Sequence, residues 1–105
     1  MRENRNTISK SLDAVKKIMK TSNEKIARKL LLDEQSIEKL SKMKDFEIPE
    51  SFLFKLHYYA VTTAENREKM QCNVGEYVKK IQKLRELKEA CAKEIKARRS
   101  EKKQG

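Results

Sequence analysis

Glycine and proline, the residues that most often interrupt or redirect a helix, are nearly absent from this chain: two glycines and one proline occur in 105 residues. Residues of high helix propensity, mainly Lys, Glu, Leu, Ala, Arg and Gln, dominate the second half of the sequence. Sheet architectures need turn residues that the chain lacks. The sequence therefore predicts an all-α fold, a small antiparallel bundle of three to four helices with a long, coiled-coil-like C-terminal helix.

The positive charge lies at the two ends of the chain. Residues 1–20 contain six Lys and Arg against two acids, residues 21–72 contain nine against nine, and residues 73–105 contain eleven against five. We expect a basic amphipathic N-terminal helix over 1–20, a helical body over 21–95 and a basic, disordered or frayed tail over 96–105. A local excess of Lys and Arg attracts polyanions, so the ends should contact an acidic partner.

The N-terminal segment pairs a hydrophobic stripe with lysines. Its apolar positions are Ile8, Leu12, Val15, Ile18 and Met19. Such a helix lies on an anionic membrane, docks in an acidic groove or packs on its own bundle. We expect packing, because a chain with 37% hydrophobic residues needs this face for its core, and a membrane surface is therefore not an expected partner.

The sequence lacks the marks of export or membrane insertion. The longest uncharged run around the aromatics, residues 56–64, is nine residues long, too short to span a bilayer. The basic N-terminus has no continuous apolar region of a secretory signal. We expect a soluble intracellular protein of the nucleus or cytoplasm, with an organelle transit peptide as the open alternative.

The cysteines and the one histidine give little support for metal or catalytic chemistry. Cys72 and Cys91 are separated by eighteen residues, and His57 precedes Cys72 by fourteen intervening residues. Structural zinc takes four ligands, usually as closely spaced pairs, and a Cys–His nucleophile also needs an orienting group and an oxyanion site. We expect reduced thiols, no metal, no cofactor and no enzymatic activity.

Capping-box spacings, in which a short polar residue precedes Glu by three positions, occur at 21–24, 62–65 and 73–76. They predict helix boundaries near Ser22, Thr62 and Asn73. Each boundary is either a turn between two helices or a bend within one helix. Asp33 is a further candidate cap, and Pro49 suits the first turn of a helix, where its missing amide is not needed.

Residues 52–61 are the most apolar part of the chain and predict its central buried helix. A β-strand has local support from the aromatics, but no second strand is available to pair with it. Tyr58 and Tyr59, side by side, could also stack on nucleic-acid bases. The balanced charge around them in the sequence favours core packing instead.

The C-terminal helix carries a hydrophobic stripe about 140° wide at 100° per residue, which begins at Val74. We expect it to bind a protein partner or a second copy. Its predicted contact residues are Tyr77, Ile81, Leu84, Leu87, Lys88, Cys91 and Ile95. Lys88 lies inside the stripe and interrupts it. Its side chain either extends along the apolar surface until its ammonium reaches water, or occupies a polar position in the interface of a coiled coil.

The same helix and the tail after it are rich in cations. They are candidates for phosphate contacts, whose affinity falls as salt is added. The predicted polyanion-binding residues are Lys79, Lys80, Lys83, Lys93, Lys96, Arg98, Arg99, Lys102 and Lys103.

Residues 26–40 resemble the helix-turn-helix of bacterial regulators. Ala27 takes the first-helix position, Asp33 caps the second helix, and Ile37 and Leu40 face inward. The resemblance covers about a sixth of the chain and implies DNA readout. It departs from the pattern at Leu31, where that family prefers glycine, and at the acidic start of the second helix, which repels phosphates. A generic two-helix corner explains the spacing equally well.

Together these features favour a non-enzymatic interaction subunit. Its hydrophobic stripes would bury against a partner, because the chain has few large residues to cover them, and its basic ends would contact an acidic surface. The alternative is a nucleic-acid-binding protein that uses both basic ends for phosphate contacts.

Overall fold

The computed structural model describes residues 5–66 and 73–104, with side chains as far as residue 100. These ranges contain α1 (Thr7–Ile18), α2 (Asn23–Leu30), α3 (Glu34–Leu40), the 3-10 turn η1 (Asp45–Glu47), α4 (Glu50–Glu65) and α5 (Val74–Gln104). No strand occurs in them, which confirms the all-helical class. They hold five α-helices, more than the three to four expected, because residues 23–40 divide into two short helices.

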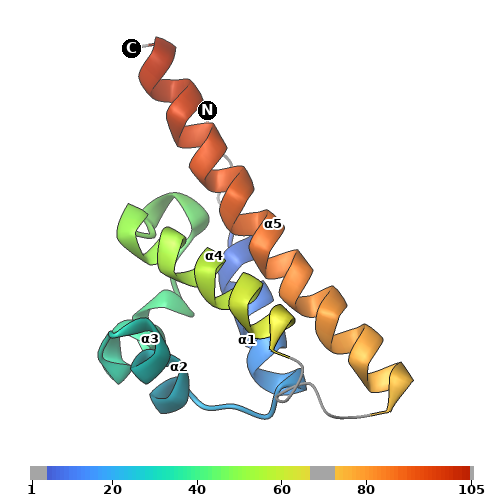
Figure 1. Ribbon diagram of the computed structural model, residues 1–105. Helices are drawn as coiled ribbons and strands as arrows, with labels where there is room; N and C mark the ends of the chain where they lie inside the picture. The colour runs from blue at the N-terminus through green and yellow to red at the C-terminus, as the bar shows by residue number, and fades with distance from the viewer. Residues whose placement is uncertain (1–4, 67–72, 105) are drawn as a thin grey trace.

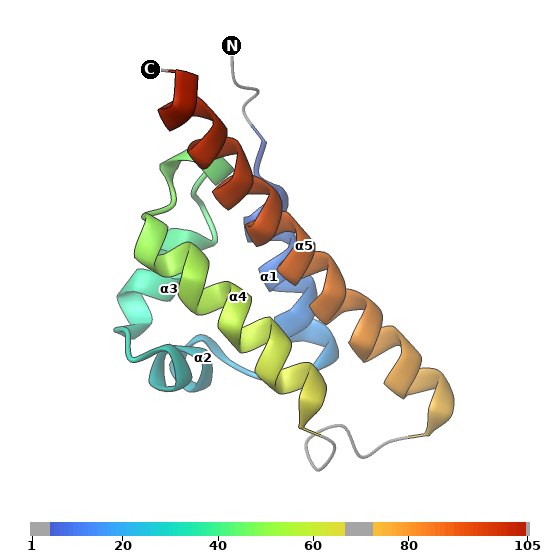
Figure 2. The same ribbon diagram turned by 45° about the horizontal axis from the view of Figure 1, so that its top comes forward.

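The long helix α5 lies along α1 and α4, whereas α2 packs against α3 and α4 (Figure 1). At 1.5 Å per residue, its 31 residues extend about 46 Å. The molecule measures 48 × 27 × 20 Å, so α5 runs its full length. The first turns of α5 stand apart from α1 and α4 in both views (Figures 1 and 2).

The core gathers aliphatic side chains from all five α-helices. Its largest fully buried members are Ile8, Leu12, Val15, Ile26, Ile37, Leu40, Ile48, Leu53, Leu56, Leu84, Leu87 and Cys91. The apolar face of α1 is therefore in the core, as its expected packing required. Each large aliphatic side chain removed from water contributes about 1.5–3 kcal/mol to the stability of the fold.

Two of the three predicted helix boundaries are real. The Ser22 hydroxyl accepts from the Lys25 N–H at 3.3 Å at the start of α2. The Asn73 side chain accepts from the Glu76 N–H at 2.9 Å at the start of α5. The boundary at Thr62 is wrong, because this residue lies inside α4. Its hydroxyl donates to the Tyr58 carbonyl at 2.9 Å, which lets a threonine continue a helix without a polar group left unpaired.

The predicted corner between residues 26 and 40 forms. Leu31 ends α2 with φ 58° and ψ 43°, in the left-handed region. The Leu32 N–H donates back to the Ala27 carbonyl at 2.9 Å, the bond that closes a Schellman motif. Leu31 thus adopts the conformation for which glycine is preferred, and its side chain is 86% exposed. Asp33 occupies the N-cap position of α3 without a side-chain cap bond.

Over 96–105, where the sequence predicts a disordered or frayed tail, α5 continues to Gln104. Arg98 anchors this part of the helix. Its guanidinium donates to the carbonyls of Ile48 at 2.6 Å, Asp45 at 3.1 Å and Phe46 at 3.3 Å. A cationic residue therefore continues the packing of α5 after the hydrophobic stripe ends at Ile95.

Candidate functional site

The centre of the predicted partner-binding stripe faces the chain's own core. Leu84, Leu87 and Cys91 are at most 1% exposed, and Ile95 is half-buried against the same core. Burial, with a smaller effect of the nearby Asp45 charge, raises the pKa of the Cys91 thiol to about 12. Within the chain, Leu84, Leu87 and Cys91 are therefore core residues, and Ile95 packs against them.

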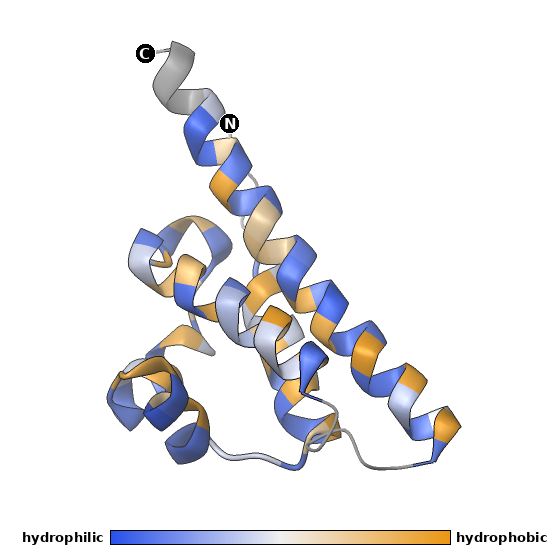
Figure 3. Cartoon of the chain, in the orientation of Figure 1, coloured by the Kyte–Doolittle hydropathy of each residue, from blue (hydrophilic) through white to orange (hydrophobic). Residues whose placement is uncertain are grey.

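The start of α5 retains an uncovered apolar surface. Val74 is 79% exposed, Val78 57% and Tyr77 39%, and Ile81 is half-buried. The spacing of these four residues is i, i+3, i+4 and i+7, the pattern of a helix that pairs with another helix. We call Val74, Tyr77, Val78 and Ile81 the docking seam. Figure 3 shows hydrophobic residues continuing to this end of α5.

The direction of the apolar face of α5 changes along the helix. At 100° per residue, the mean direction of the docking seam lies about 100° from that of Leu84, Leu87 and Cys91. At the start of α5, Val74, Tyr77 and Val78 are exposed, whereas Ile81 is half-buried against the core. Sequence reasoning missed Val78, although its position four residues after Val74 and three before Ile81 signals the seam.

A small groove between α4 and α5 adjoins the docking seam at Ile81. It has a volume of about 180 Å³. Its lining residues are Ala60, Val61, Ala64, Glu65, Ile81, Leu84, Arg85 and Lys88. Lys88 is exposed at this groove, so the polar interruption of the stripe lies beside the uncovered surface. Of the predicted stripe residues, Tyr77 and Lys88 are exposed, and Ile81 and Ile95 are half-buried.

The predicted polyanion-binding residues form no single patch. Lys79, Lys80 and Lys83 lie near the start of α5, where Lys83 is 3.6 Å from the Glu86 carboxylate. Lys93, Lys96 and Arg99 are exposed near its other end. About 30 Å of helix separates Lys79 from Arg99. The side chains of Lys102 and Lys103 lie outside the described residues.

Arg98, a predicted polyanion contact, makes several bonds within the chain. Besides its three carbonyl acceptors, its Nε is 2.8 Å from the Glu94 carboxylate, and its side chain is 20% exposed. These bonds use Nε and Nη2, which carry three of the five N–H donors of the guanidinium. The charged residue that interrupts the apolar pattern here fixes α5 to the backbone of residues 45–48.

A second surface, absent from the sequence-based candidates, lies where the α1–α2 turn and α2 meet α4. Its volume is about 440 Å³. Its lining residues are Met19, Lys20, Thr21, Lys25, Arg28, Lys29, Tyr59 and Thr63. We call these eight residues the cationic groove, since four are basic and none is acidic. The signal in the sequence is the basic spacing at 25, 28 and 29, which places three cations on one side of a helix.

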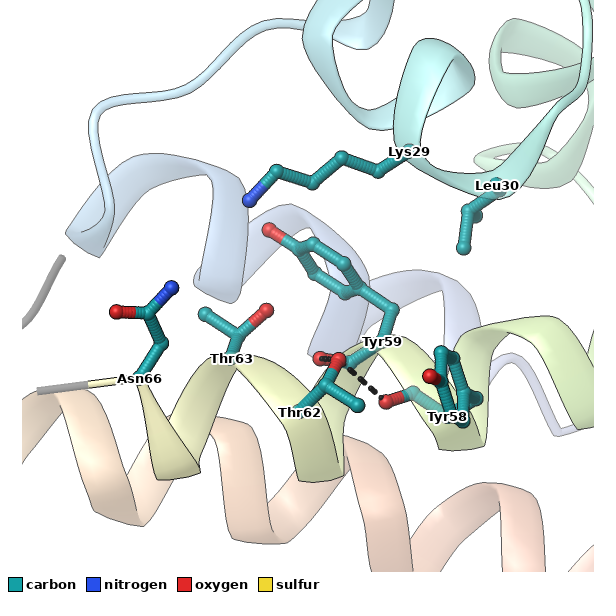
Figure 4. Close-up of a pocket in the computed structure, with 7 residues that line it drawn as sticks. All are labelled: Lys29, Leu30, Tyr58, Tyr59, Thr62, Thr63 and Asn66. Atoms are coloured by element: carbon teal, nitrogen blue, oxygen red, sulfur yellow. Dashed lines mark hydrogen bonds between the residues drawn. The ribbon is translucent and has the colours of Figure 1, made fainter.

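The cationic groove continues into a neighbouring pocket of about 250 Å³ (Figure 4). Lys29, Tyr59 and Thr63 line both spaces. The Lys29 ammonium lies 5.8 Å from the centroid of the Tyr59 ring. Tyr58, 69% exposed, lines the second pocket. Of the paired tyrosines, Tyr59 is therefore a core residue, as expected, whereas Tyr58 is a surface residue.

The described residues contain no cluster of three or more His, Cys, Asp and Glu side chains able to hold a metal ion. Cys72 lies outside them. Among the helices described here, none combines the length and the apolar character needed to cross a bilayer. Searches against protein-family models, curated proteins and solved structures give no match.

Proposed function

We propose that this protein is an intracellular helical interaction module, acting in the nucleus or cytoplasm, that captures an acidic amphipathic helix of another protein on the docking seam. The observation that carries the proposal is the exposed set of Val74, Tyr77 and Val78, continued by the half-buried Ile81 at i+7, on a helix end that stands away from the body. In this proposal α1, α4 and the middle of α5 act as an antiparallel bundle that holds the seam in place.

Hydrophobic burial supplies the driving force. Complete coverage of one valine or one aromatic side chain contributes about 1.5–3 kcal/mol. The first turns of α5 are already helical and anchored by the packing of Leu84 and Leu87. A partner helix therefore meets a pre-organised surface and loses less conformational entropy on binding.

The charges around the docking seam favour an acidic partner. At 100° per residue, Arg85 and Lys88 lie within about 30° of the direction of the docking seam, and both line the groove beside Ile81. A second copy of this chain would bring the same cations to the interface, whereas glutamates along a partner helix would pair with them. Complementary charge sets partner choice and association rate more than affinity.

The test uses two designed amphipathic peptides that share leucines at a and d positions and carry either glutamate or lysine at e and g. We expect the acidic peptide to bind the full chain in fluorescence anisotropy. Val78→Asp should weaken this binding by at least about tenfold, because the aspartate must be desolvated against leucine. Leu31→Asp is the matched control, since Leu31 is also an exposed hydrophobic residue but lies on the α2–α3 corner.

Three results would contradict the proposal. Equal binding of the acidic and basic peptides would show that charge does not select the partner. Equal losses of peptide affinity in Val78→Asp and Leu31→Asp would show that the docking seam is not the binding surface. Concentration-dependent dimerisation that Val78→Asp abolishes, with no peptide binding, would assign the seam to a second copy instead.

A nucleic-acid contact is the second candidate, and the set Lys93, Lys96 and Arg99 favours it. These residues recur every third position and are exposed, while the intervening Glu94 is paired with Arg98. Replacing all three with glutamine should reduce both the affinity for generic duplex DNA and its dependence on salt. Unchanged salt dependence in this variant would exclude the contact.

A further inference from the structure

We propose that the cationic groove and the pocket beside it bind a nucleoside phosphate, with the phosphates among Lys20, Lys25 and Lys29 and the base against Tyr58. This site is independent of the docking seam, which lies at the start of α5. Three separate segments of the chain build it: the α1–α2 turn, one side of α2 and the last turns of α4.

The basic side of α2 supplies most of the positive charge. Lys25, Arg28 and Lys29 line the groove, opposite the buried Ile26 and Leu30. The Arg28 guanidinium is 2.7 Å from the Glu24 carboxylate, so part of its charge is neutralised. Lys20, Lys25 and Lys29 add to the positive charge of the groove, and cations gathered in a concave surface raise the local concentration of anions.

Lys20 reaches the groove from a backbone position that disfavours it. Its φ is 52°, in the left-handed region, where a residue with a Cβ is less stable than glycine. Helix-end bonds hold the turn there: the Thr21 N–H donates to the Lys16 carbonyl at 3.1 Å, and the Lys20 N–H donates to the Lys17 carbonyl at 3.3 Å. A cation thus occupies a position where glycine would be more stable.

The α4 side of the site supplies hydroxyl groups and an aromatic face. In Figure 4 the Tyr59 hydroxyl and the Lys29 ammonium point to the same end of the pocket, near Thr63. Burial raises the pKa of the Tyr59 phenol, so this hydroxyl stays neutral beside an anion. Tyr58 offers the exposed ring on which a base can stack. Its backbone carbonyl accepts from the Thr62 hydroxyl at 2.9 Å.

The size of the site favours a small molecule over a polymer. The two spaces, about 440 and 250 Å³, fall in or near the range of small-ligand pockets, roughly 300–1,000 Å³. They are joined through Lys29, Tyr59 and Thr63. A ligand with a charged end and a planar end matches this arrangement, whereas a bare phosphate would use the charged end alone.

The test is calorimetric titration of the full chain at physiological salt with ATP, inorganic pyrophosphate and a single-stranded oligonucleotide. We expect ATP to bind more tightly than pyrophosphate. The Lys25→Gln/Lys29→Gln double variant should weaken ATP binding about tenfold or more, since one charge-assisted hydrogen bond contributes roughly that factor. Tyr58→Ala should weaken ATP binding and leave pyrophosphate binding unchanged.

The matched control is Lys39→Gln/Lys42→Gln, which removes the same charge from exposed positions outside the groove. An equal loss in this variant would overturn the site, as would the absence of ATP binding or equal affinity for ATP and pyrophosphate. Tighter binding of the oligonucleotide through the same lysines would assign the groove to nucleic acid and also overturn the proposal. Val78→Asp should leave ATP binding unchanged, which separates this result from the test of the docking seam.

Discussion

The carboxylate of Asp45 accepts a hydrogen bond at 2.9 Å from the backbone N–H of Ile8, 37 positions earlier in the chain. Ile8 lies in the first turn of α1, and Asn6, at the N-cap position, makes no side-chain cap bond. A residue of the η1 turn thus performs the capping role that a neighbouring residue usually fills. The Asp45 N–H also donates to the Arg5 carbonyl at 2.7 Å.

Asp45→Ala should destabilise the protein by about 1–2 kcal/mol, because it leaves an orphan N–H at the start of α1. Urea unfolding followed by circular dichroism measures this change. Asp45→Asn retains an acceptor oxygen and should recover most of the loss. Equal losses in the two variants would show that the carboxylate acts in another way.

The pKa of Asp45 gives a dependence of stability on pH. Burial raises this pKa above its ordinary value of 3.8, the bond from Ile8 lowers it, and the Glu94 charge raises it further. The folded state therefore binds a proton more tightly than the unfolded state. Between pH 3.8 and the raised pKa, the contribution of Asp45 to stability falls as the pH rises.

Asp45→Asn should remove this contribution. The difference in unfolding free energy between the original protein and Asp45→Asn, measured by urea titration at a series of pH values, should move in favour of the variant as the pH rises through that window. A constant difference would mean that Asp45 has the same pKa in the folded and unfolded states.

Arg98→Ala and Arg99→Ala form a matched pair of adjacent substitutions. Arg98 donates to three backbone carbonyls and pairs with Glu94, whereas Arg99 is exposed. We expect Arg98→Ala to cost about 2–3 kcal/mol, in the range for hydrogen bonds of charged groups, and Arg99→Ala to cost less than about 0.5 kcal/mol. Similar midpoints of thermal unfolding for the two variants would contradict the anchor.

The sequence predicted the all-helical fold class, the amphipathic character of α5 and the cap at Asn73. These features depend on residues that lie within one or two helical turns of each other. It did not predict the role of Arg98, whose acceptors lie about fifty positions away. When its hydrogen-bond acceptors are so distant in sequence, a cation that follows the end of an apolar stripe is predicted to be exposed to solvent. The cationic groove was not predicted for the same reason. Lys25 and Tyr59 are distant in sequence and line one groove only in the folded chain.

Periodicity also failed to separate the two parts of the α5 stripe. It identified the apolar positions from Tyr77 to Ile95, but a helical wheel does not show where a neighbouring helix ends. Leu87 lies opposite α1 and α4, whereas Tyr77 lies at the end of α5 that stands apart from them. Burial along one stripe therefore depends on the lengths of its neighbours.

Leu31→Gly should stabilise the protein. A side chain with φ 58° is disfavoured relative to glycine by about 1 kcal/mol, and the leucine is 86% exposed, so its removal sacrifices little packing. Leu31→Ala keeps the Cβ and should leave stability nearly unchanged. Chemical denaturation of both variants checks the comparison, and a destabilised Leu31→Gly protein would contradict the left-handed turn.

Leu87→Ala and Val78→Ala test the division of α5 into core and docking seam. Leu87 is 0% exposed, so its truncation should leave a cavity and cost about 2–5 kcal/mol. Val78 is 57% exposed, and its truncation should change stability by less than about 0.5 kcal/mol. Urea unfolding measures both.

Loss of partner binding in a Leu87 variant would reflect loss of the fold, whereas loss of binding in a stable Val78 variant would report on the surface itself. Equal destabilisation by the two substitutions would place Val78 in the core and remove the docking seam.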